Sequence, residues 1–465
     1  ICINDPELVA DTVHRALDGF RELVALGVDF AQDGVRYAQR RAVGSTYPRS
    51  CYVASVMWGG MAARKLTRAL EQKGARLEGL QVVRLLKVDC AAVGAVAIDR
   101  RTREPALIRA KVVVLANGGI GNLYGHSTYP KDVSGSAYAL AFHAGAMLRD
   151  LEFIQFEPLV GRNPGAISGY AFPTTLLNEG AVLRDRDGKR FLFDFRPQGE
   201  EGIGKEELVR CIATMGEQDR ALDASGVWLD ATAVPPEKLF NYKWLNTFAK
   251  KHGLAMDRAP VDIWPAAHSC LGCVVVDRKR RSTVPGLYAV GEAATGIHGA
   301  GRIGASSGTD VLASGAIVGH AATTDARARG EAASWSSIED ACAAAFDFDA
   351  PADDASDAEI RRIADRRREI LGATAGIFRS GPAMQRGLSE LEALYAEVRP
   401  RARPHPASVR LGTADGLLVA GLVLDSALGR EESRGTHLRR DFPDANPTLG
   451  RSLRREWGKH GAFNA

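Results

Sequence analysis

A glycine-rich loop between two apolar segments constrains the fold of this chain more than any other feature. It lies in residues 286–322, where GLYAV is typical of a buried strand and SSGTDVLASGAIVGHAA of a helix built from small residues. Ser306, Ser307 or Thr309 is available to cap that helix. A strand, a glycine loop and a helix in this order present backbone N–H groups and a positive helix end to an anion or an electron-rich ring. We therefore expect an α/β fold.

Two further features favour a bound cofactor over simple tight packing of the loop. Gly291 and Glu292 directly follow the strand, and Arg302 stands among the glycines. A second apolar run, predicted to be a fully buried strand, ends in a glycine turn at residues 117–121. Since ligands of α/β sheets bind at the ends of strands, these features together predict a large cofactor lying across several strand ends.

Length and charge indicate a globular protein of more than one domain. A chain of 465 residues exceeds the roughly 100 to 200 residues of a typical domain, so we expect two or three domains. The net charge of +4 is too small to predict nucleic acid or an anionic membrane as a partner. No uninterrupted apolar run approaches the ~18 to 20 residues of a membrane span, and no signal peptide opens the sequence. We expect a cytoplasmic protein.

The cysteines predict reduced thiols. Seven cysteines, an odd number scattered along the chain, do not fit a disulfide framework. Cys270 and Cys273 have the C-x-x-C spacing, but no second pair lies nearby. A zinc site and a redox dithiol are therefore less favoured than two small packed side chains beside a glycine. We expect no metal site.

The N-terminal third predicts helices followed by strands. Residues 4–30 have the periodicity of a helix pair, with Asp5 as N-cap and Pro6 at the first helical position. Residues 59–77 predict another helix. Three runs rich in Val, Ile and Leu within residues 80–119 predict strands.

The remaining chain separates into an inserted region and a helical end. Residues 158–264 mix short strands, a polar turn and one helix, which is the pattern of an inserted domain. An acidic linker occupies residues 346–358, and helical periodicity continues through residue 398. We expect the chain to end in a helical domain.

Five segments, in the same order, resemble the flavoproteins of the succinate dehydrogenase, fumarate reductase and L-aspartate oxidase family. HGAGRIGASSGTDVL is similar to the family signature H-G-A-N-R-L-G-x-N-S-L, and VVVLANGGIGNLY to A-T-G-G-A-G-x-x-Y. LRDLEFIQFEP resembles L-x-D-M-E-F-x-Q-F-H-P, and PAAHSCLGCVVVD resembles T-A-H-Y-x-M-G-G-I. Near the end, GREESRGTHLRRDFP resembles R-x-E-S-R-G-x-H-x-R-x-D-Y-P. The number and order of the matches make the resemblance specific.

The resemblance implies an α/β fold with three parts. They are a Rossmann-like FAD-binding domain, an inserted α+β capping domain and a C-terminal helical domain. On this sequence the FAD-binding domain would take residues 1–157 and 265–333, the capping domain 158–264, and the helical domain with its tail 334–465.

FAD is the cofactor that the resemblance implies. Glu292 would meet the ribityl chain, and the backbone around Ser306 and Ser307 would face the flavin pyrimidine, where a helix N-terminus stabilises the charge of reduced flavin. The residues implied to bind the cofactor are Asn117, Gly118, Gly119, Gly291, Glu292, Ser306 and Ser307.

The family also implies how a substrate carboxylate is held. Arg302 would bind the carboxylate bidentately, and His268 would hydrogen-bond the same group. The structural alternatives are an Arg302 paired with a neighbouring acid and a His268 that caps a strand end. Arg434 and His437 match the family as well, and either serve function or lock the helical domain against the flavin domain.

Two catalytic positions depart from the family pattern. Glu157 stands where the family has the histidine of Q-F-H-P, which binds the second carboxylate of the substrate. Two carboxylates repel unless one is protonated or a cation intervenes, so we expect an amine, an amide or a neutral group at the far end of the substrate. Lys205 stands where the family has a proton-transferring arginine, and an exposed lysine at a helix start is the alternative.

Two further family segments are altered or lacking. The T-E-x-x-R-G-x-G segment of the capping domain is poorly kept, with Thr174 and Leu177 at Glu and Arg in an ungapped alignment, or Asn178 and Glu179 at Thr and Glu in a gapped one. The family begins with a strand, a G-x-G-x-x-G turn and a helix that hold the FAD pyrophosphate, and this unit does not precede Ile1. We expect it in a longer polypeptide or in a complementary chain, unless FAD binding has been lost.

Together these observations predict an FAD-dependent dehydrogenase, reductase or oxidase. Hydride would pass between flavin N5 and a carbon adjacent to a carboxylate in a small organic or amino acid. The expected catalytic residues are Arg302, His268, Lys205 and Glu157. Two alternatives stay open, namely the flavoprotein component of an electron-transfer complex with an iron–sulfur partner, and an inactive homologue that acts as an interaction or scaffold protein.

Overall fold

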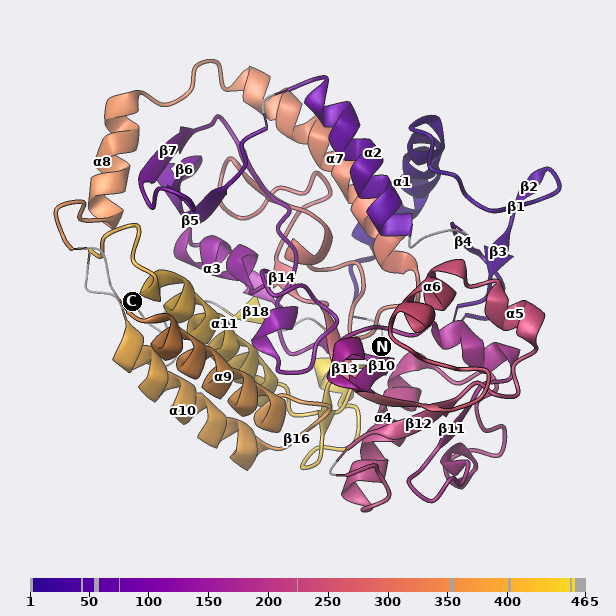
Figure 1. The fold of residues 1–465 in the computed structure, drawn as a ribbon. Coiled ribbons are helices and arrows are strands. Elements are labelled where there is room, and N and C mark those ends of the chain that lie inside the picture. The colour runs from indigo at the N-terminus through magenta and orange to yellow at the C-terminus, as the bar shows by residue number, and fades with distance from the viewer. Residues whose placement is uncertain are drawn as a thin grey trace.

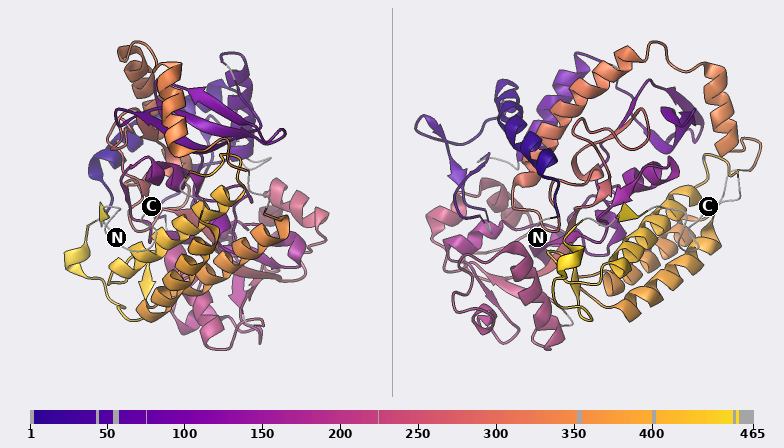
Figure 2. Two further views of the ribbon diagram at one scale, coloured as in Figure 1. Left: turned by 90° about the vertical axis from the view of Figure 1, so that its left-hand side faces the viewer. Right: turned by 180° about the vertical axis from the view of Figure 1, so that it is seen from behind.

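The computed structural model describes residues 3–42, 45–53, 58–74, 76–223, 225–351, 355–399, 403–451 and 454–455. Three regions are visible in Figure 1: an N-terminal region that packs against the long helix α7 (Ser306–Ala328), a region of short strands and helices, and a bundle of helices near the C-terminus. Figure 2 shows from two further sides that the helical bundle and the strand-rich region lie next to each other. The expected α/β architecture with a helical C-terminal part is confirmed.

The first helix, α1 (Pro6–Ala25), is one continuous helix. Asp5 caps it by accepting hydrogen bonds from two N–H groups of the first turn, as predicted. The predicted helix pair is wrong, because the apolar periodicity runs unbroken to the end of α1. This helix packs along α7 (Ser306–Ala328), and Gly19 permits the close approach because a Cβ there would overlap Leu312.

A small cluster of apolar side chains joins α1 to helix α2 (Trp58–Glu71). The chain between these helices forms two short antiparallel hairpins. Their strands are β1 (Gln32–Asp33), β2 (Arg36–Tyr37), β3 (Gln39–Arg40) and β4 (Ser50–Cys51).

The three strands predicted in residues 80–119 are present as β5, β6 and β8 (Val113–Leu115). A further strand, β7, was not predicted and completes the antiparallel sheet β5–β6–β7, in which β6 is buried along most of its length. Helix α8 (Trp335–Ala345) covers this sheet with Ile338 and Cys342. The bounds are β5 (Leu80–Val88), β6 (Ala91–Asp99) and β7 (Pro105–Arg109).

The two strands that lead into the glycine turns pair in parallel. These are β8 (Val113–Leu115) and β15 (Leu287–Ala289), and the Val290 N–H donates to the Leu115 carbonyl at 3.0 Å. Their turns therefore begin side by side. The prediction of a fully buried strand is wrong for β8, because Val114 is 37% exposed, and in the described part of the chain β8 pairs with β15 alone.

A four-stranded antiparallel sheet, in the order β10–β13–β12–β11, forms the middle region. The expected domain boundaries after residues 157 and 264 fall inside β10 and β13, which are long enough to belong to both neighbouring regions. The strands are β10 (Ile154–Asn163), β11 (Val182–Arg184), β12 (Val227–Asp230) and β13 (Val261–Cys270).

Three helices accompany this sheet, whereas the sequence predicted one. Helix α4 (Lys205–Glu217) lies where it was expected, and it contacts β10 and β13. The two missed helices are α5 (Pro236–Phe240) and α6 (Lys243–Lys251). Both are short, so periodicity alone gave little signal for them.

Three long helices form the C-terminal bundle, and the predicted helical end is confirmed. They are α9 (Asp357–Thr374), α10 (Gly381–Val398) and α11 (Arg410–Gly429). A parallel pair of short strands, β16 (Phe378–Arg379) and β17 (Leu438–Arg439), lies at one end of the bundle.

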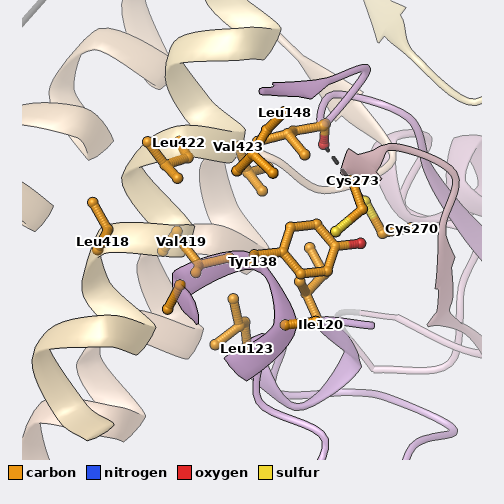
Figure 3. Close-up of a cluster of buried hydrophobic side chains, with 14 of the residues drawn as sticks. Ile120, Leu123, Tyr138, Leu148, Cys270, Cys273, Leu418, Val419, Leu422 and Val423 are labelled. Atoms are coloured by element: carbon orange, nitrogen blue, oxygen red, sulfur yellow. Dashed lines mark hydrogen bonds between the residues drawn. The ribbon is translucent and has the colours of Figure 1, made fainter. Parts of the chain in front are cut away.

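The main core joins the bundle to the region that carries the two glycine turns. Tyr138, on helix α3 (Ser136–His143), lies at its centre and donates a hydrogen bond to the Gly272 carbonyl at 2.7 Å. Short strands β9 (Leu148–Arg149), β14 (Cys273–Val274) and β18 (Arg454–Arg455) run nearby. Figure 3 shows the Tyr138 ring between two groups of side chains, Leu418, Val419, Leu422 and Val423 of α11 on one side, and Cys270 and Cys273 on the other.

The cysteine pair packs in this core. Cys270 and Cys273 are free thiols, and burial raises the pKa of Cys270 to about 12. That environment disfavours a reactive thiolate, so the packing interpretation of the C-x-x-C pair fits the structure. Within the described ranges, no group of three or more His, Cys, Asp or Glu side chains is arranged to hold a metal ion.

Helix α11 is the most apolar helix of the bundle. By length and composition it could span a membrane, with a mean hydropathy of 1.5, and 78% of the apolar window is buried inside the protein. Burial against α9, α10 and α3 accounts for this composition.

Candidate functional site

A pocket of about 340 Å³ lies where the start of α7 meets the end of β13 and the turn after β15. It brings together Arg302, His268, Glu292 and Ser307, four of the predicted site residues that are far apart in sequence. The complete lining is Thr128, Tyr129, Pro130, His268, Ser269, Cys270, Leu271, Glu292, Ala294, His298, Arg302, Ser307, Asp310 and Val311.

Arg302 supplies a buried positive charge to the pocket. Its side chain is 5% exposed, and its Nη1 donates to the Ser307 hydroxyl at 3.3 Å, while Nε has no hydrogen-bond partner among the described residues. Gln155 donates to the Arg302 carbonyl at 2.9 Å and holds this part of the loop in place. No described carboxylate forms an ion pair with this guanidinium, so the alternative of pairing with a neighbouring acid does not fit. A buried guanidinium of this kind is suited to an anion.

His268 lies beside this guanidinium, near the end of β13. Its Nδ1 is 2.8 Å from the Thr128 hydroxyl, and its Nε2 is 3.5 Å from Glu157 Oε2. Desolvation lowers the pKa of His268 to about 4, partly offset by Glu157, so the ring is neutral at neutral pH. A neutral imidazole with one nitrogen held by a hydroxyl can hydrogen-bond a substrate through the other.

Glu157 and Lys205 form a buried ion pair behind His268. Lys205 Nζ lies 2.6 Å from Glu157 Oε2, and each side chain is 9% exposed. Burial alone would raise the pKa of Glu157, but Lys205, His268 and Arg302 more than offset this, and the pKa is lowered. The alternative of an exposed Lys205 is wrong, because the first turn of α4 faces β10 and buries the side chain. Neither residue lines the pocket directly.

Glu292 is held in the pocket wall by three contacts. Its Oε1 accepts a hydrogen bond from the Cys270 N–H at 2.8 Å, and its Oε2 accepts one from the Tyr129 hydroxyl. Its carboxylate lies against Gly119, where a Cβ would overlap it. Desolvation raises the pKa of Glu292 to about 7.

The start of α7 carries Ser306 and Ser307. The preceding residue, Ala305, has a left-handed φ of 69°, and in the described structure no side chain caps the helix. The predicted cap by Ser306, Ser307 or Thr309 is therefore absent, and the Ser306 hydroxyl instead donates to the Ile303 carbonyl at 2.6 Å. An uncapped N-terminus beside the pocket leaves its positive end to a ligand.

Asn117 and Gly118 lie outside the lined pocket. The turn places Gly118 at a φ of 79°, which favours glycine, and Asn117 Nδ2 donates to the Ser136 hydroxyl at 2.8 Å. Because β8 and β15 end side by side, this turn adjoins Gly291, where a Cβ would lie 3.1 Å from Val311. Because glycine has no Cβ, the backbone at these positions stays open to close approach by another group.

Tyr129 and Thr128 are two residues of the site that the sequence did not predict. The Tyr129 hydroxyl donates a hydrogen bond to Glu292, and the Thr128 hydroxyl hydrogen-bonds His268 Nδ1. Both residues lie on an irregular segment, and its sequence pattern gave no sign of a ligand contact. Their roles arise from a loop that meets the end of β13, where the Thr128 N–H donates to the Ala267 carbonyl at 3.1 Å.

The residues that align with the family segment T-E-x-x-R-G-x-G do not line the pocket in either alignment. Leu177 is buried in the core of the middle region, and Thr174 lies in the same short helical turn. In the gapped alternative, Glu179 accepts a hydrogen bond from Tyr242 at 2.9 Å and Asn178 contacts the Arg41 carbonyl at 3.5 Å.

Arg434 and His437 belong to a buried ion network. His437 is fully buried, with Nδ1 2.8 Å from Arg379 and Nε2 3.1 Å from the Arg430 carbonyl. Arg434 donates to Glu432 at 2.8 Å. Both residues are absent from the pocket lining, so the locking interpretation fits the structure.

Comparison with known proteins identifies the family. The FAD binding domain family matches residues 3–307, and the fumarate reductase flavoprotein C-terminal family matches residues 365–464. The chain is an FAD-dependent oxidoreductase of the fumarate reductase and L-aspartate oxidase family. An L-aspartate oxidase of Caulobacter vibrioides is 32% identical to this flavoprotein, and the match covers 95% of the flavoprotein and 80% of the L-aspartate oxidase. A fumarate reductase (CoM/CoB) subunit of Methanothermobacter marburgensis is 29% identical over 97% of this chain and 83% of that protein.

Solved structures have the same fold. A quinol fumarate reductase of E. coli matches with a TM-score of 0.85 and 23% identity, covering 96% of the flavoprotein and 80% of that chain. Sdh1 of Mycobacterium smegmatis matches with a TM-score of 0.77 and 27% identity, covering 96% of the flavoprotein and 78% of that chain.

The pocket of the flavoprotein fits its cofactor, FAD. An uncapped helix N-terminus, glycines that leave no Cβ in the way and a partly apolar wall suit a flavin ring. The fold places Glu292 and Ser307 in that wall. The expected turn for the pyrophosphate has no counterpart among the described residues.

Proposed function

We propose that this flavoprotein transfers a hydride between flavin N5 and a carbon adjacent to a carboxylate in a small organic or amino acid. The observation that carries the proposal is the buried guanidinium of Arg302, which lines the pocket without a carboxylate partner among the described residues. Bound FAD would supply the acceptor or donor of the hydride. The protein would bind and orient the substrate, exclude water, and donate or accept one proton.

Arg302 and His268 are the proposed carboxylate ligands. A guanidinium offers two parallel N–H donors to a carboxylate, and burial strengthens this contact because little water competes. His268, neutral and fixed by Thr128, would donate a further hydrogen bond through Nε2. Two such ligands would fix both the position and the rotation of the substrate beside the ring.

Lys205 is the proposed proton donor or acceptor. Glu157 stabilises its ammonium charge at 2.6 Å in a buried site. Lys205 does not line the pocket, so this role requires a substrate that extends past His268 toward Nζ. In the reducing direction Nζ would then give a proton to the substrate carbon next to the one that accepts hydride, and in the oxidising direction it would take that proton. Glu157 is proposed to position Lys205 for this task.

The test replaces Arg302 in the flavin-loaded protein. Arg302→Gln is expected to weaken binding of a carboxylate substrate about 100-fold or more, since the charge and a bidentate contact worth about 3 kcal/mol are lost. Arg302→Lys keeps the charge and is expected to lose about tenfold. Binding is measured from the change in flavin absorbance.

Both variants are also expected to keep bound flavin and the wild-type melting temperature. Equal carboxylate binding by wild type and Arg302→Gln would contradict the proposal. It would favour the alternative of an inactive homologue that acts as an interaction protein.

A second candidate is that the chain is the flavoprotein component of an electron-transfer complex. The observation in its favour is the similarity to a protein named as one subunit of a fumarate reductase. Affinity purification of the tagged flavoprotein from its own cells, followed by iron analysis, tests this. An iron–sulfur partner in constant ratio would support the candidate, and flavoprotein without iron that reduces oxygen directly would contradict it.

A further inference from the structure

We propose that this site selects substrates with a single carboxylate at Arg302 and a far end that donates hydrogen bonds and carries no negative charge. The inference rests on the proposed function, since it concerns the substrate of that same site. It follows from how charges are distributed around the pocket and behind His268, which forms part of the pocket wall.

The pocket has one cation for substrate binding. Among its described lining residues, Arg302 is the only Lys or Arg, whereas Glu292 and Asp310 contribute carboxylates. Asp310 lies 3.4 Å from His298 Nε2, so this carboxylate already has a partner in the wall. One substrate carboxylate is matched by Arg302, and a second one would enter a wall that already contains acids.

Lys205, the cation that lies behind His268, is already neutralised by Glu157. Lys205 lies 2.6 Å from Glu157 Oε2, and both side chains are buried. A second substrate carboxylate could use Lys205 only by displacing Glu157. Displacement would leave Glu157, on the central part of β10, buried without its cation, which is strongly unfavourable.

Glu157 does not itself line the pocket but lies directly behind His268, which does, and a substrate end that extends past His268 would meet a free acceptor on Glu157. Its contacts with Lys205 and His268 both involve Oε2, and Oε1 has no hydrogen-bond partner in the described part of the chain. A carboxylate offers no donor to this oxygen, whereas an amide or an amine does. The chemistry at this end of the site therefore favours an N–H donor over a second carboxylate.

The test compares two ligands of equal length, succinate and succinamate, which differ only in that one carboxylate is an amide. Calorimetric titration of the flavin-loaded protein measures both dissociation constants. We expect succinamate to bind at least about tenfold more tightly than succinate. Succinate binding as tightly as succinamate, or more tightly, overturns the inference.

The variant Glu157→Gln tests the cause. Without the carboxylate, Lys205 is free for a substrate anion, so succinate affinity is expected to rise at least about tenfold while succinamate affinity stays within about threefold. Glu200→Gln is the matched control, because Glu200 is also buried and pairs with Arg190 at 2.6 Å, but unlike Glu157 it contacts no residue that lines the pocket. An unchanged succinate affinity in Glu157→Gln overturns the inference.

The outcomes separate the inference from the proposed function. If neither ligand binds wild-type protein that retains its flavin, the carboxylate site itself is refuted, and the inference falls with it. If both bind through Arg302 but succinate is preferred, only the selectivity is refuted. Should Glu157→Gln fail to fold, the two wild-type dissociation constants still decide.

Discussion

At the scale of single residues, the site depends on which buried charges are paired within the protein. Glu157 and Lys205 neutralise each other, whereas Arg302 has no carboxylate partner among the described residues. Sequence alone identified these three positions but not the pairing, because Glu157 and Lys205 are 48 positions apart and meet only when α4 packs on β10. The exposed-lysine alternative failed for the same reason.

Replacing Lys205 is expected to destabilise the protein. Lys205→Met leaves the Glu157 carboxylate buried without its cation, at a cost of about 3 kcal/mol in the free energy of unfolding. The double variant Glu157→Leu with Lys205→Met is expected to recover most of that loss. Chemical denaturation of the three proteins measures the coupling, and additive effects would show that the pair does not interact.

Glu292 predicts a dependence of stability on pH. Its pKa in the folded protein is raised to about 7, above an ordinary value near 4.5. The stability that depends on a protonated Glu292 is therefore fully present below pH 4.5 and is lost as the pH rises through 7. The loss is at most about 3 kcal/mol. Glu292→Gln should abolish this part of the pH profile in flavin-free protein.

The comparison isolates Glu292 because the variant retains the other titrating groups. His268 acts in the opposite direction, since its lowered pKa of about 4 means stability is lost as pH falls. Parallel pH profiles for wild type and Glu292→Gln between pH 4.5 and 7 would refute the assignment.

At the scale of elements, α7 was well predicted except at its first residue. The periodicity and small residues located the helix, but the expected serine cap is absent because Ala305 enters it in the left-handed conformation. Such a backbone state arises from the surrounding loop and leaves no sequence signal when the residue is not glycine. The helices α5 and α6 were missed because short helices carry little periodicity.

Ala305→Gly is expected to stabilise the protein. The φ of 69° costs an alanine about 1 kcal/mol that glycine does not incur, although glycine has greater freedom in the unfolded chain. We expect a net gain of about 0.5 kcal/mol in the free energy of unfolding. Ala313→Gly, in the interior of the same helix, is the control and should lose about 1 kcal/mol.

At the scale of the whole molecule, a buried ion network joins the C-terminal bundle to the strand-rich region. Glu152, just before β10, accepts hydrogen bonds from Ser426 of α11 and from Arg430, and both side chains of the Glu152–Arg430 pair are fully buried. The sequence motif GREESRGTHLRRDFP located this region. It did not show whether its charged residues bind substrate or hold the fold, since that depends on burial.

Glu152→Gln is expected to destabilise the whole chain by about 3 kcal/mol or more, because Arg430 would remain buried with a weaker partner. Thermal unfolding measures the effect. Arg440→Gln is the control, since Arg440 pairs with Glu217 at the surface and should change stability by less than about 1 kcal/mol. Equal effects of the two variants would show that the network does not join the regions.

The central claim is that Arg302 and His268 hold a substrate carboxylate beside the flavin. A crystal structure of the flavin-loaded protein with succinamate tests it most directly. We predict the carboxylate within hydrogen-bond distance of both side chains, with its neighbouring carbon against the flavin ring and its amide toward Glu157. A carboxylate bound elsewhere, or an Arg302 engaged by a carboxylate of the protein, would contradict the account.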